Sequence, residues 1–166
     1  ELDGGQKNVR YYGNLNQDAL CGVSLALTRK GPSYVFGNVI TNLGDSTGKS
    51  GVAIKNGYRY LDAPMGRAFL FNNTFISNGW STVAGWGETP VLMDTKNNII
   101  LSTQSANVHA LSDDVFKSVN NNFDYDLLGN PHRPNGAGTF SSLSRETIQS
   151  LSLRLVIAIR SMSYEK

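Results

Sequence analysis

The sequence is poor in the residues from which many functional sites are built. Its 166 residues include one cysteine and two histidines, which excludes an internal disulfide, a cysteine-based zinc site and a histidine-rich metal cage. Charged residues make up only 17%, and the net charge is +2. No nucleic-acid partner is expected, because a surface that follows phosphates carries clustered Lys and Arg. No membrane partner is expected either, because the sequence contains no apolar run of about 18 residues.

The composition instead favours a single folded domain that is rich in turns. Hydrophobic residues make up 40% of the chain, which is enough for a core and argues against disorder. The 17 glycines, together with many asparagines, indicate tight turns and left-handed backbone positions. Helical periodicity is almost absent before residue 147, so an all-β fold is expected.

The most regular feature is a repeat marked by asparagine. Five short segments place an asparagine corner between apolar residues: 11–15, 35–39, 70–74, 96–99 and 120–123. We take as equivalent Asn14, Asn38, Asn73, Asn98 and Asn122, whose spacings are 24, 35, 25 and 24 residues. Near-equal steps with one insertion predict a solenoid, with the insertion forming loops within 43–50 and 56–67.

Each repeat is interpreted as a strand, a tight asparagine corner and a second strand. Asparagine tolerates the left-handed region, so we expect it to occupy that position in the corner. Stacked coils place equivalent residues about 4.8 Å apart. At that spacing the asparagine amides can form a hydrogen-bonded ladder, so their expected role is structural.

A second column of strands is suggested by alternation of period two. Gly22–Leu27 and 51–55 show it most clearly, and 82–86 and 107–111 fit more loosely. The expected inward-facing set is Val23, Leu25, Val52, Ile54, Val83, Val108 and Ala110. Across the coils, the expected outward rows are Ser24, Ala53, Ala84 and His109, then Ala26, Lys55, Trp86 and Leu111, then Thr28, Gly57, Glu88 and Asp113.

The pattern changes at the C-terminal end. From Thr147 onward, apolar residues recur at helical steps of three and four, although a strand over 153–157 competes with the helix. An amphipathic tail could cover the apolar end of the solenoid. We therefore expect β-helix coils over 1–140 and a helical or packed capping tail over 141–166.

Three segments carry a family resemblance. Tyr11-Tyr12-Gly13-Asn14, the stretch 31–42 and the stretch 122–134 resemble right-handed parallel β-helix proteins of the pectate-lyase-like superfamily, over roughly residues 8–140. The resemblance implies a right-handed parallel β-helix of about five coils. It also implies a secreted or cell-surface protein that acts on an acidic polysaccharide, as a polysaccharide lyase or glycoside hydrolase. A non-catalytic structural or adhesive β-helix is the alternative. The small number of coils also suggests a fragment of a longer protein.

In the resembling enzymes sugar chains lie along one outer sheet, which directs attention to the outward rows. Lys55, Glu88, His109 and Asp113 are therefore the candidate catalytic residues. Lys55 could neutralise a uronate or act as a base, and His109 titrates near neutrality. Glu88 and Asp113 could form an acid–base pair or half of a Ca²⁺ site, so Ca²⁺ is a possible cofactor. Each also has a plain interpretation as a surface or turn residue.

Sugar-binding candidates come from two places. Trp86 could stack on a sugar ring or simply cover a loop. Tyr58, Arg59 and Arg67 lie in the insertion, where mixed basic and aromatic residues suit an acidic glycan or form a surface loop held by its own salt bridges.

The N-terminal end is expected to take part in self-association. Residues 1–8 are short and polar, so they are not expected to seal the first coil. An open coil exposes strand edges and its apolar cross-section. We expect a homodimer through the N-terminal coil, arranged about a two-fold axis. The alternative is that upstream coils cover this end.

Overall fold

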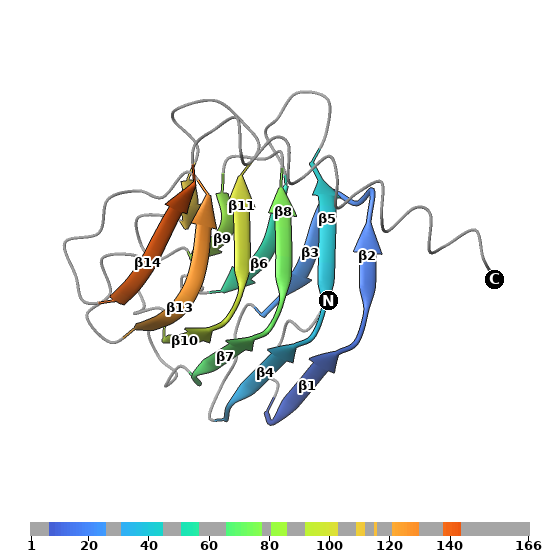
Figure 1. The fold of residues 1–166 in the computed structure, drawn as a ribbon. Coiled ribbons are helices and arrows are strands. Elements are labelled where there is room, and N and C mark those ends of the chain that lie inside the picture. The colour runs from blue at the N-terminus through green and yellow to red at the C-terminus, as the bar shows by residue number, and fades with distance from the viewer. Residues whose placement is uncertain are drawn as a thin grey trace.

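The computed structural model of the chain describes a stack of short parallel strands (Figure 1). The described residues are 7–25, 31–44, 51–56, 66–77, 81–85, 92–102, 109–111, 115, 121–129 and 138–143. The first two coils contain β1 (Val9–Tyr12), β2 (Leu15–Gln17), β3 (Cys21–Ser24), β4 (Ser33–Phe36), β5 (Val39–Leu43) and β6 (Val52–Asn56). The next two contain β7 (Ala68–Phe71), β8 (Thr74–Ser77), β9 (Ser81–Gly85), β10 (Met93–Lys96), β11 (Ile99–Ser102) and β12 (His109–Leu111). Then follow β13 (Asn122–Gly129) and β14 (Gly138–Leu143).

Every strand pairs in parallel with the equivalent strand of the neighbouring coil. Among the described residues, one sheet runs β1-β4-β7-β10-β13-β11-β8-β5-β2 and a second runs β12-β9-β6-β3. The long strand β13 pairs with both β10 and β11, so it joins two sides of the solenoid. Successive coils wind in the right-handed sense (Figure 1), as parallel crossover connections almost always do. The all-β parallel β-helix expected from the repeat is confirmed.

The asparagine ladder is present at the corner between the first two strands of each coil. Asn14 donates to Oδ1 of Asn38, Asn38 to Asn73 and Asn73 to Asn98, each through its backbone N–H and its side-chain amide. The fifth position is Asp126, which accepts the same pair of hydrogen bonds from Asn98.

The assignment of Asn122 to the ladder is therefore wrong. Asn122 lies on β13 opposite Asp94, four residues before the corner. The 24-residue spacing pointed to Asn122, but a carboxylate oxygen accepts the same hydrogen bonds as an amide oxygen. Asp126 therefore fills the corner at a spacing of 28 residues.

The expectation that the ladder asparagines are left-handed is also wrong. The left-handed residue is the one before each of them: Gly13 (φ 65°), Gly37 (φ 63°), Asn72 (φ 54°), Asn97 (φ 57°) and Tyr125 (φ 54°). The corner thus needs two different residue properties at adjacent positions. The first residue tolerates positive φ, and the second presents a side-chain oxygen to its neighbour in the stack.

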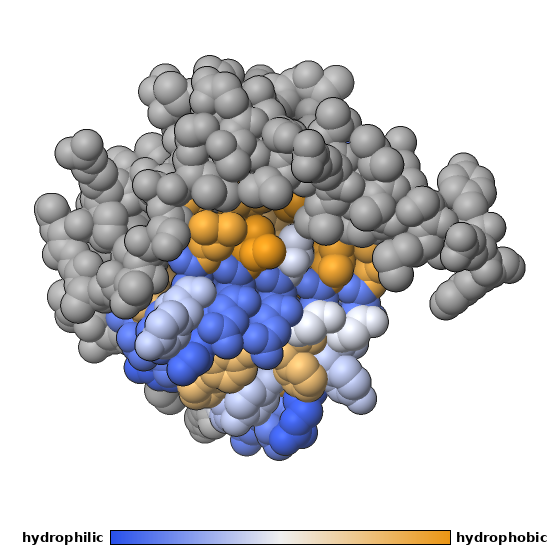
Figure 2. Space-filling model, viewed as in Figure 1, coloured by the Kyte–Doolittle hydropathy of each residue, from blue (hydrophilic) through white to orange (hydrophobic). Residues whose placement is uncertain are grey.

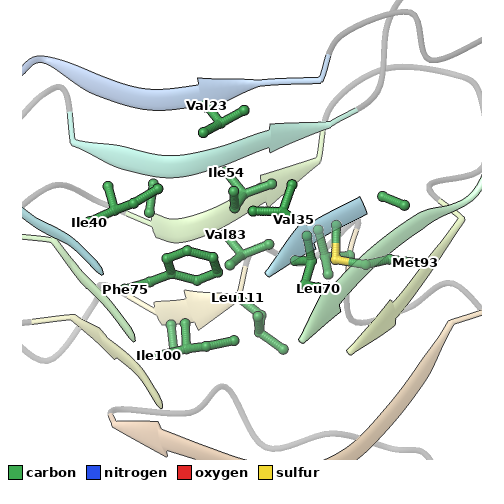
Figure 3. Packing of buried hydrophobic residues seen from close by; sticks show 14 of the residues in the cluster. Val23, Val35, Ile40, Ile54, Leu70, Phe75, Val83, Met93, Ile100 and Leu111 are labelled. Atoms are coloured by element: carbon green, nitrogen blue, oxygen red, sulfur yellow. The ribbon is translucent and has the colours of Figure 1, made fainter. Parts of the chain in front are cut away.

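The core fills the interior of the coils (Figure 3). One inward row, Val23–Ile54–Val83–Leu111, comes from the second sheet, and it faces rows such as Ile40–Phe75–Ile100–Leu128 from the first. All the members of the expected inward set that are described are buried: Val23, Leu25, Val52, Ile54, Val83 and Ala110. Val108 lies outside the described residues.

The last described strand crosses the expected end of the coils. β14 pairs in parallel with β13, with Phe140 opposite Asp126 and Leu143 opposite Gly129. Strand pairing therefore continues to residue 143. The expected capping tail beyond that point lies outside the described residues.

Gly22 is expected to be irreplaceable in β3. A Cβ atom at this position would lie 2.4 Å from the carbonyl oxygen of Ala53 and 2.9 Å from Cγ2 of Ile40. Because a backbone atom cannot move aside as a side chain can, Gly22→Ala should lower the free energy of unfolding by about 1–3 kcal/mol. Urea unfolding measures this change. The exposed variant Gln17→Ala should stay within about 0.5 kcal/mol of the parent, and an equally small effect of Gly22→Ala would contradict the close approach.

Candidate functional site

Three of the sequence-predicted site residues lie among the described residues: Lys55 on β6, His109 on β12, and Arg67 just before β7. The other candidates lie outside the described residues: Trp86, Glu88, Asp113, Tyr58 and Arg59. The carboxylate pair and the Ca²⁺ site that Glu88 and Asp113 were expected to form therefore remain predictions.

The expected register of the second sheet is wrong. Lys55 lies opposite Ser24 on one side and Ala84 on the other, whereas we expected it beside Ala26 and Trp86. His109 lies opposite Ser81 rather than Ala84. The number of residues between paired positions differs from one pair of strands to the next, so alternation alone could not determine which residues lie opposite one another.

Leu111 and Ala53 were expected to point outward, but both are fully buried in the core. The outward face of the second sheet is therefore smaller than the expected rows implied. The structure does not place Lys55 and His109 in one row: Lys55 belongs to the row of Ser24 and Ala84, and His109 to the row of Ser81.

Arg67 is held by an ion pair to the first sheet. Its Nη1 atom lies 2.6 Å from Oδ1 of Asp94 on β10, and both side chains are partly exposed. Because the backbone carbonyl of Arg67 also accepts a hydrogen bond from the amide of Ser33, the residue is fixed at the edge of the strand face that contains Asp94.

That face is the most distinctive surface of the described structure. It consists of the outward residues of β1, β4, β7, β10 and β13, which form two parallel rows. One row is Arg10–Tyr34–Phe69–Asp94–Asn122, and the other is Tyr12–Phe36–Phe71–Lys96–Asp124. We call these ten residues the outer strand face. Its first three coils are mainly aromatic and its last two are charged or polar.

The aromatic rings of the outer strand face stack on one another along the solenoid. Tyr12 and Phe36 have ring centroids 4.9 Å apart at an interplanar angle of 3°. Tyr34 and Phe69 are 5.2 Å apart at 14°. Rings that share their faces in this way direct their edges to solvent, and the edge of an aromatic ring carries partial positive charge.

Charged groups border the rings at both ends. The guanidinium of Arg10 lies 5.6 Å from the centroid of the Tyr34 ring. At the other end, Nζ of Lys96 lies 3.3 Å from Oδ2 of Asp124 and 5.3 Å from the centroid of the Tyr125 ring. The Lys96 side chain is half exposed, so its charge can also act on groups in solution. In Figure 2, a hydrophilic band separates hydrophobic areas above and below it.

The outer strand face could have been found in the sequence. Tyr12, Phe36 and Phe71 each stand two residues before a ladder asparagine, and Tyr34 and Phe69 each stand four residues before one. Alternation along a strand makes these positions point to the same side. The asparagine alignment thus contained this face, but the candidate site residues were sought in the second column of strands and in the insertion.

Asp126 is a buried acid at the end of the ladder. It is 2% exposed and accepts hydrogen bonds from the backbone and side-chain amides of Asn98 at 2.7 and 2.8 Å, and from the hydroxyl of Thr95. Burial raises the pKa of Asp126 above its ordinary value, and these hydrogen bonds offset part of the rise. Thr95 is itself buried, at the inward position that Val35 and Leu70 occupy in earlier coils.

Asp126 should make folding stability depend on pH. Because its pKa is raised above the ordinary value of 3.8, the folded state binds more protons than the unfolded state between 3.8 and the raised folded-state pKa. The contribution of Asp126 to the free energy of unfolding is therefore complete at pH values below its ordinary pKa, and it is lost as pH rises through the folded-state pKa. Urea unfolding from pH 3.5 to 7 should show that Asp126→Asn gains stability relative to the parent as pH rises. If the difference in free energy of unfolding between Asp126→Asn and the parent did not change with pH, the pKa of Asp126 would not be raised by burial.

Within the described ranges, no three side chains of His, Cys, Asp or Glu gather where they could hold a metal ion. Within the same ranges, no helix is long and apolar enough to cross a membrane.

Comparison with known proteins finds no match for this chain among protein families, curated proteins or solved structures.

Proposed function

We propose that this protein binds an acidic polysaccharide along its outer strand face. The observation that carries the proposal is the pair of outward rows on β1, β4, β7 and β10, in which stacked aromatic rings lead into charged side chains. These rows repeat at the strand spacing of about 4.8 Å, so they offer a linear ligand a regular series of similar contacts.

The ring geometry favours an oxygen-rich and negatively charged ligand. The C–H edges of Phe36 and Phe69 carry partial positive charge and Tyr34 ends in a hydroxyl donor, so these rings attract hydroxyl and carboxylate oxygens more than apolar groups. Arg10 supplies a positive charge at one end of the aromatic region, and at the other end half-exposed Lys96 supplies a positive charge that it shares with Asp124. A chain of uronate sugars has carboxylates and hydroxyls along its whole length and matches both features.

The pectate-lyase-like superfamily is the proposed family. The parallel coils and the asparagine ladder support that assignment, as does the resemblance of the corner segments. A polysaccharide ligand of this kind implies an extracellular or cell-surface location, which is part of the proposal. Lyase or hydrolase chemistry on Lys55, Glu88, His109 and Asp113, which the resemblance implies, would be an additional activity of the protein.

A structural or adhesive role is the second candidate. It is favoured by the direct stacking of Tyr12 on Phe36 and of Tyr34 on Phe69, because such pairs stabilise neighbouring coils without any ligand. In that role the aromatic rows would strengthen the solenoid, and the face would bind no glycan.

Calorimetric titration with an oligouronate, and separately with a neutral oligoglucan of equal length, distinguishes the two roles. The proposal predicts binding of the oligouronate, weakened about 3- to 10-fold by Arg10→Gln and by Lys96→Gln. Lys7→Gln removes the same charge from an exposed residue outside the outer strand face and should leave the affinity unchanged. Absence of binding to either glycan would favour the structural role. Absorbance of unsaturated products in the same samples tests for lyase activity.

A further inference from the structure

The corner between β7 and β8 in the third coil contains a sequence that has the form of an N-glycosylation acceptor. Asn72-Asn73-Thr74 matches Asn-x-Ser/Thr, and no other asparagine of the chain is followed by serine or threonine two residues later. Transferases that attach sugar to asparagine recognise the hydroxyl at the third position of this motif. A match of three residues arises readily by chance, so the surroundings of each side chain decide whether the motif can be used.

The two asparagines of this corner have opposite surroundings. Asn73 is 1% exposed, and its side-chain amide donates to the carbonyl of Val35 and to Oδ1 of Asn98. Asn72 is exposed and left-handed, with a φ of 54°, and among the residues that the structure describes none hydrogen-bonds to its side chain. N-glycosylation attaches a bulky sugar to the side-chain nitrogen. Asn72 can therefore carry a glycan in the folded state without loss of a buried hydrogen bond, whereas Asn73 cannot.

The corner is held closed by residues that come later in the chain. The backbone N–H of Asn72 donates to the carbonyl of Lys96 at 3.0 Å, and that of Asn73 donates to Oδ1 of Asn98 at 2.9 Å. Both partners belong to the next coil, so these hydrogen bonds are absent while the third coil is being synthesised. A transferase that acts on the growing chain thus meets the motif before the corner closes, and the folded corner leaves the product in solvent.

The fourth coil has the same corner without the motif. Asn97 is also exposed and left-handed, with a φ of 57°, and it precedes the ladder residue Asn98. Two residues after Asn97 stands Ile99, which lies opposite Thr74 in the pairing of β11 with β8. The two corners therefore differ at the position that the transferase recognises, where one has a hydroxyl and the other an aliphatic side chain. The chain thus contains a matched corner that lacks only the hydroxyl.

We propose that Asn72 is an acceptor for an N-linked glycan. The co-reactant is an oligosaccharide joined through a diphosphate to a lipid. Nδ2 of Asn72 attacks the anomeric carbon of the first sugar, the bond from that carbon to the diphosphate oxygen breaks, and a nitrogen–carbon bond forms. The nitrogen loses one proton to a base of the transferase, the lipid diphosphate leaves with the bonding electrons, and nothing is oxidised or reduced. The proposal rests on the proposed extracellular location, because such transferases act on exported chains, but it does not depend on polysaccharide binding.

Expression of the full chain behind an export signal in a eukaryotic host tests the proposal. The intact mass of the chain is measured in both cells and medium, before and after treatment with a peptide-N-glycosidase, which converts a modified asparagine to aspartate. Thr74→Ile introduces the residue that the next coil has at this position. Asn72→Gly introduces the residue that the two preceding coils have before the ladder asparagine. Ile99→Thr completes the motif at Asn97.

The parent chain should gain the mass of one oligosaccharide, and peptide mapping should place the resulting aspartate at position 72. Thr74→Ile and Asn72→Gly should abolish the modification, whereas Ile99→Thr should add a second oligosaccharide. An unmodified parent chain would overturn the proposal, as would modification that survives Thr74→Ile or an Ile99→Thr chain without a second oligosaccharide. Because the added signal exports the chain, none of these results depends on its native location, and calorimetry with the oligouronate on unmodified chain tests polysaccharide binding separately.

Discussion

Replacing Asn73 by leucine should lower the free energy of unfolding by about 2–5 kcal/mol. Asn73 is 1% exposed, and its Oδ1 accepts from the backbone and side-chain amides of Asn38 at 3.1 and 3.0 Å. Its own amide donates to the carbonyl of Val35 and to Oδ1 of Asn98, both at 2.9 Å. Leucine fills a similar volume but removes these four buried hydrogen bonds, and it takes away the acceptor of the Asn38 backbone N–H.

The adjacent residue provides a matched control for this prediction. Asn72 is exposed and left-handed, at the position that glycine occupies in the two preceding coils. Because glycine adopts this conformation without strain, Asn72→Gly should change stability by about 0.5 kcal/mol or less. Urea unfolding measures the free energy of unfolding of both variants, and their m-values should equal that of the parent. A loss below about 0.5 kcal/mol for Asn73→Leu would show that the ladder contributes little.

Thr95 and Asp126 should be strongly coupled. Thr95→Val alone removes a hydroxyl donor from a buried carboxyl group, which should cost about 1–3 kcal/mol. In the double variant with Asp126→Asn, the new amide takes the place that asparagine fills in the earlier coils. The valine introduced on β10 then matches Val35, its counterpart in the second coil.

The double variant should therefore lose less free energy of unfolding than the two single variants lose together. The difference, which is the coupling energy, should be about 1–3 kcal/mol. A double-mutant cycle by urea unfolding at pH 7 measures this energy. Thr41→Val combined with Asp126→Asn serves as a control, because Thr41 is a buried threonine on β5, away from the acid. Additivity of the Thr95 and Asp126 changes would contradict the proposed pairing.

The sequence was sufficient for the fold because the asparagine corners recur in successive coils. Each corner requires the same side-chain oxygen at the same place, so the repeat survives changes in loop length. The sequence search looked for asparagine and therefore missed Asp126. Hydrogen bonding at the corner needs only an acceptor oxygen, which either asparagine or aspartate can provide. The hydroxyl of Thr95, on a different strand, stabilises the acid there.

The second column of strands was harder to predict for a physical reason. Its strands are only three to five residues long, and the paired positions are separated by 31 residues between β3 and β6 but by 29 between β6 and β9. Period-two alternation identifies the strands but leaves their mutual register open. The neighbours of Lys55 could therefore not be deduced, and the expected row with Trp86 and Leu111 was wrong.

Mapping of bound oligouronate by amide chemical shifts in solution tests the central claim most directly, because it separates the two faces of the solenoid. The proposal predicts that saturating ligand shifts the amide signals of outward residues on β1, β4, β7 and β10, with the largest changes near Tyr34, Phe69 and Lys96. Signals of the strands around Lys55 on the second sheet should stay within experimental error. Shifts confined to β3, β6 and β9, or no shifts at all, would contradict a glycan-binding role for the outer strand face.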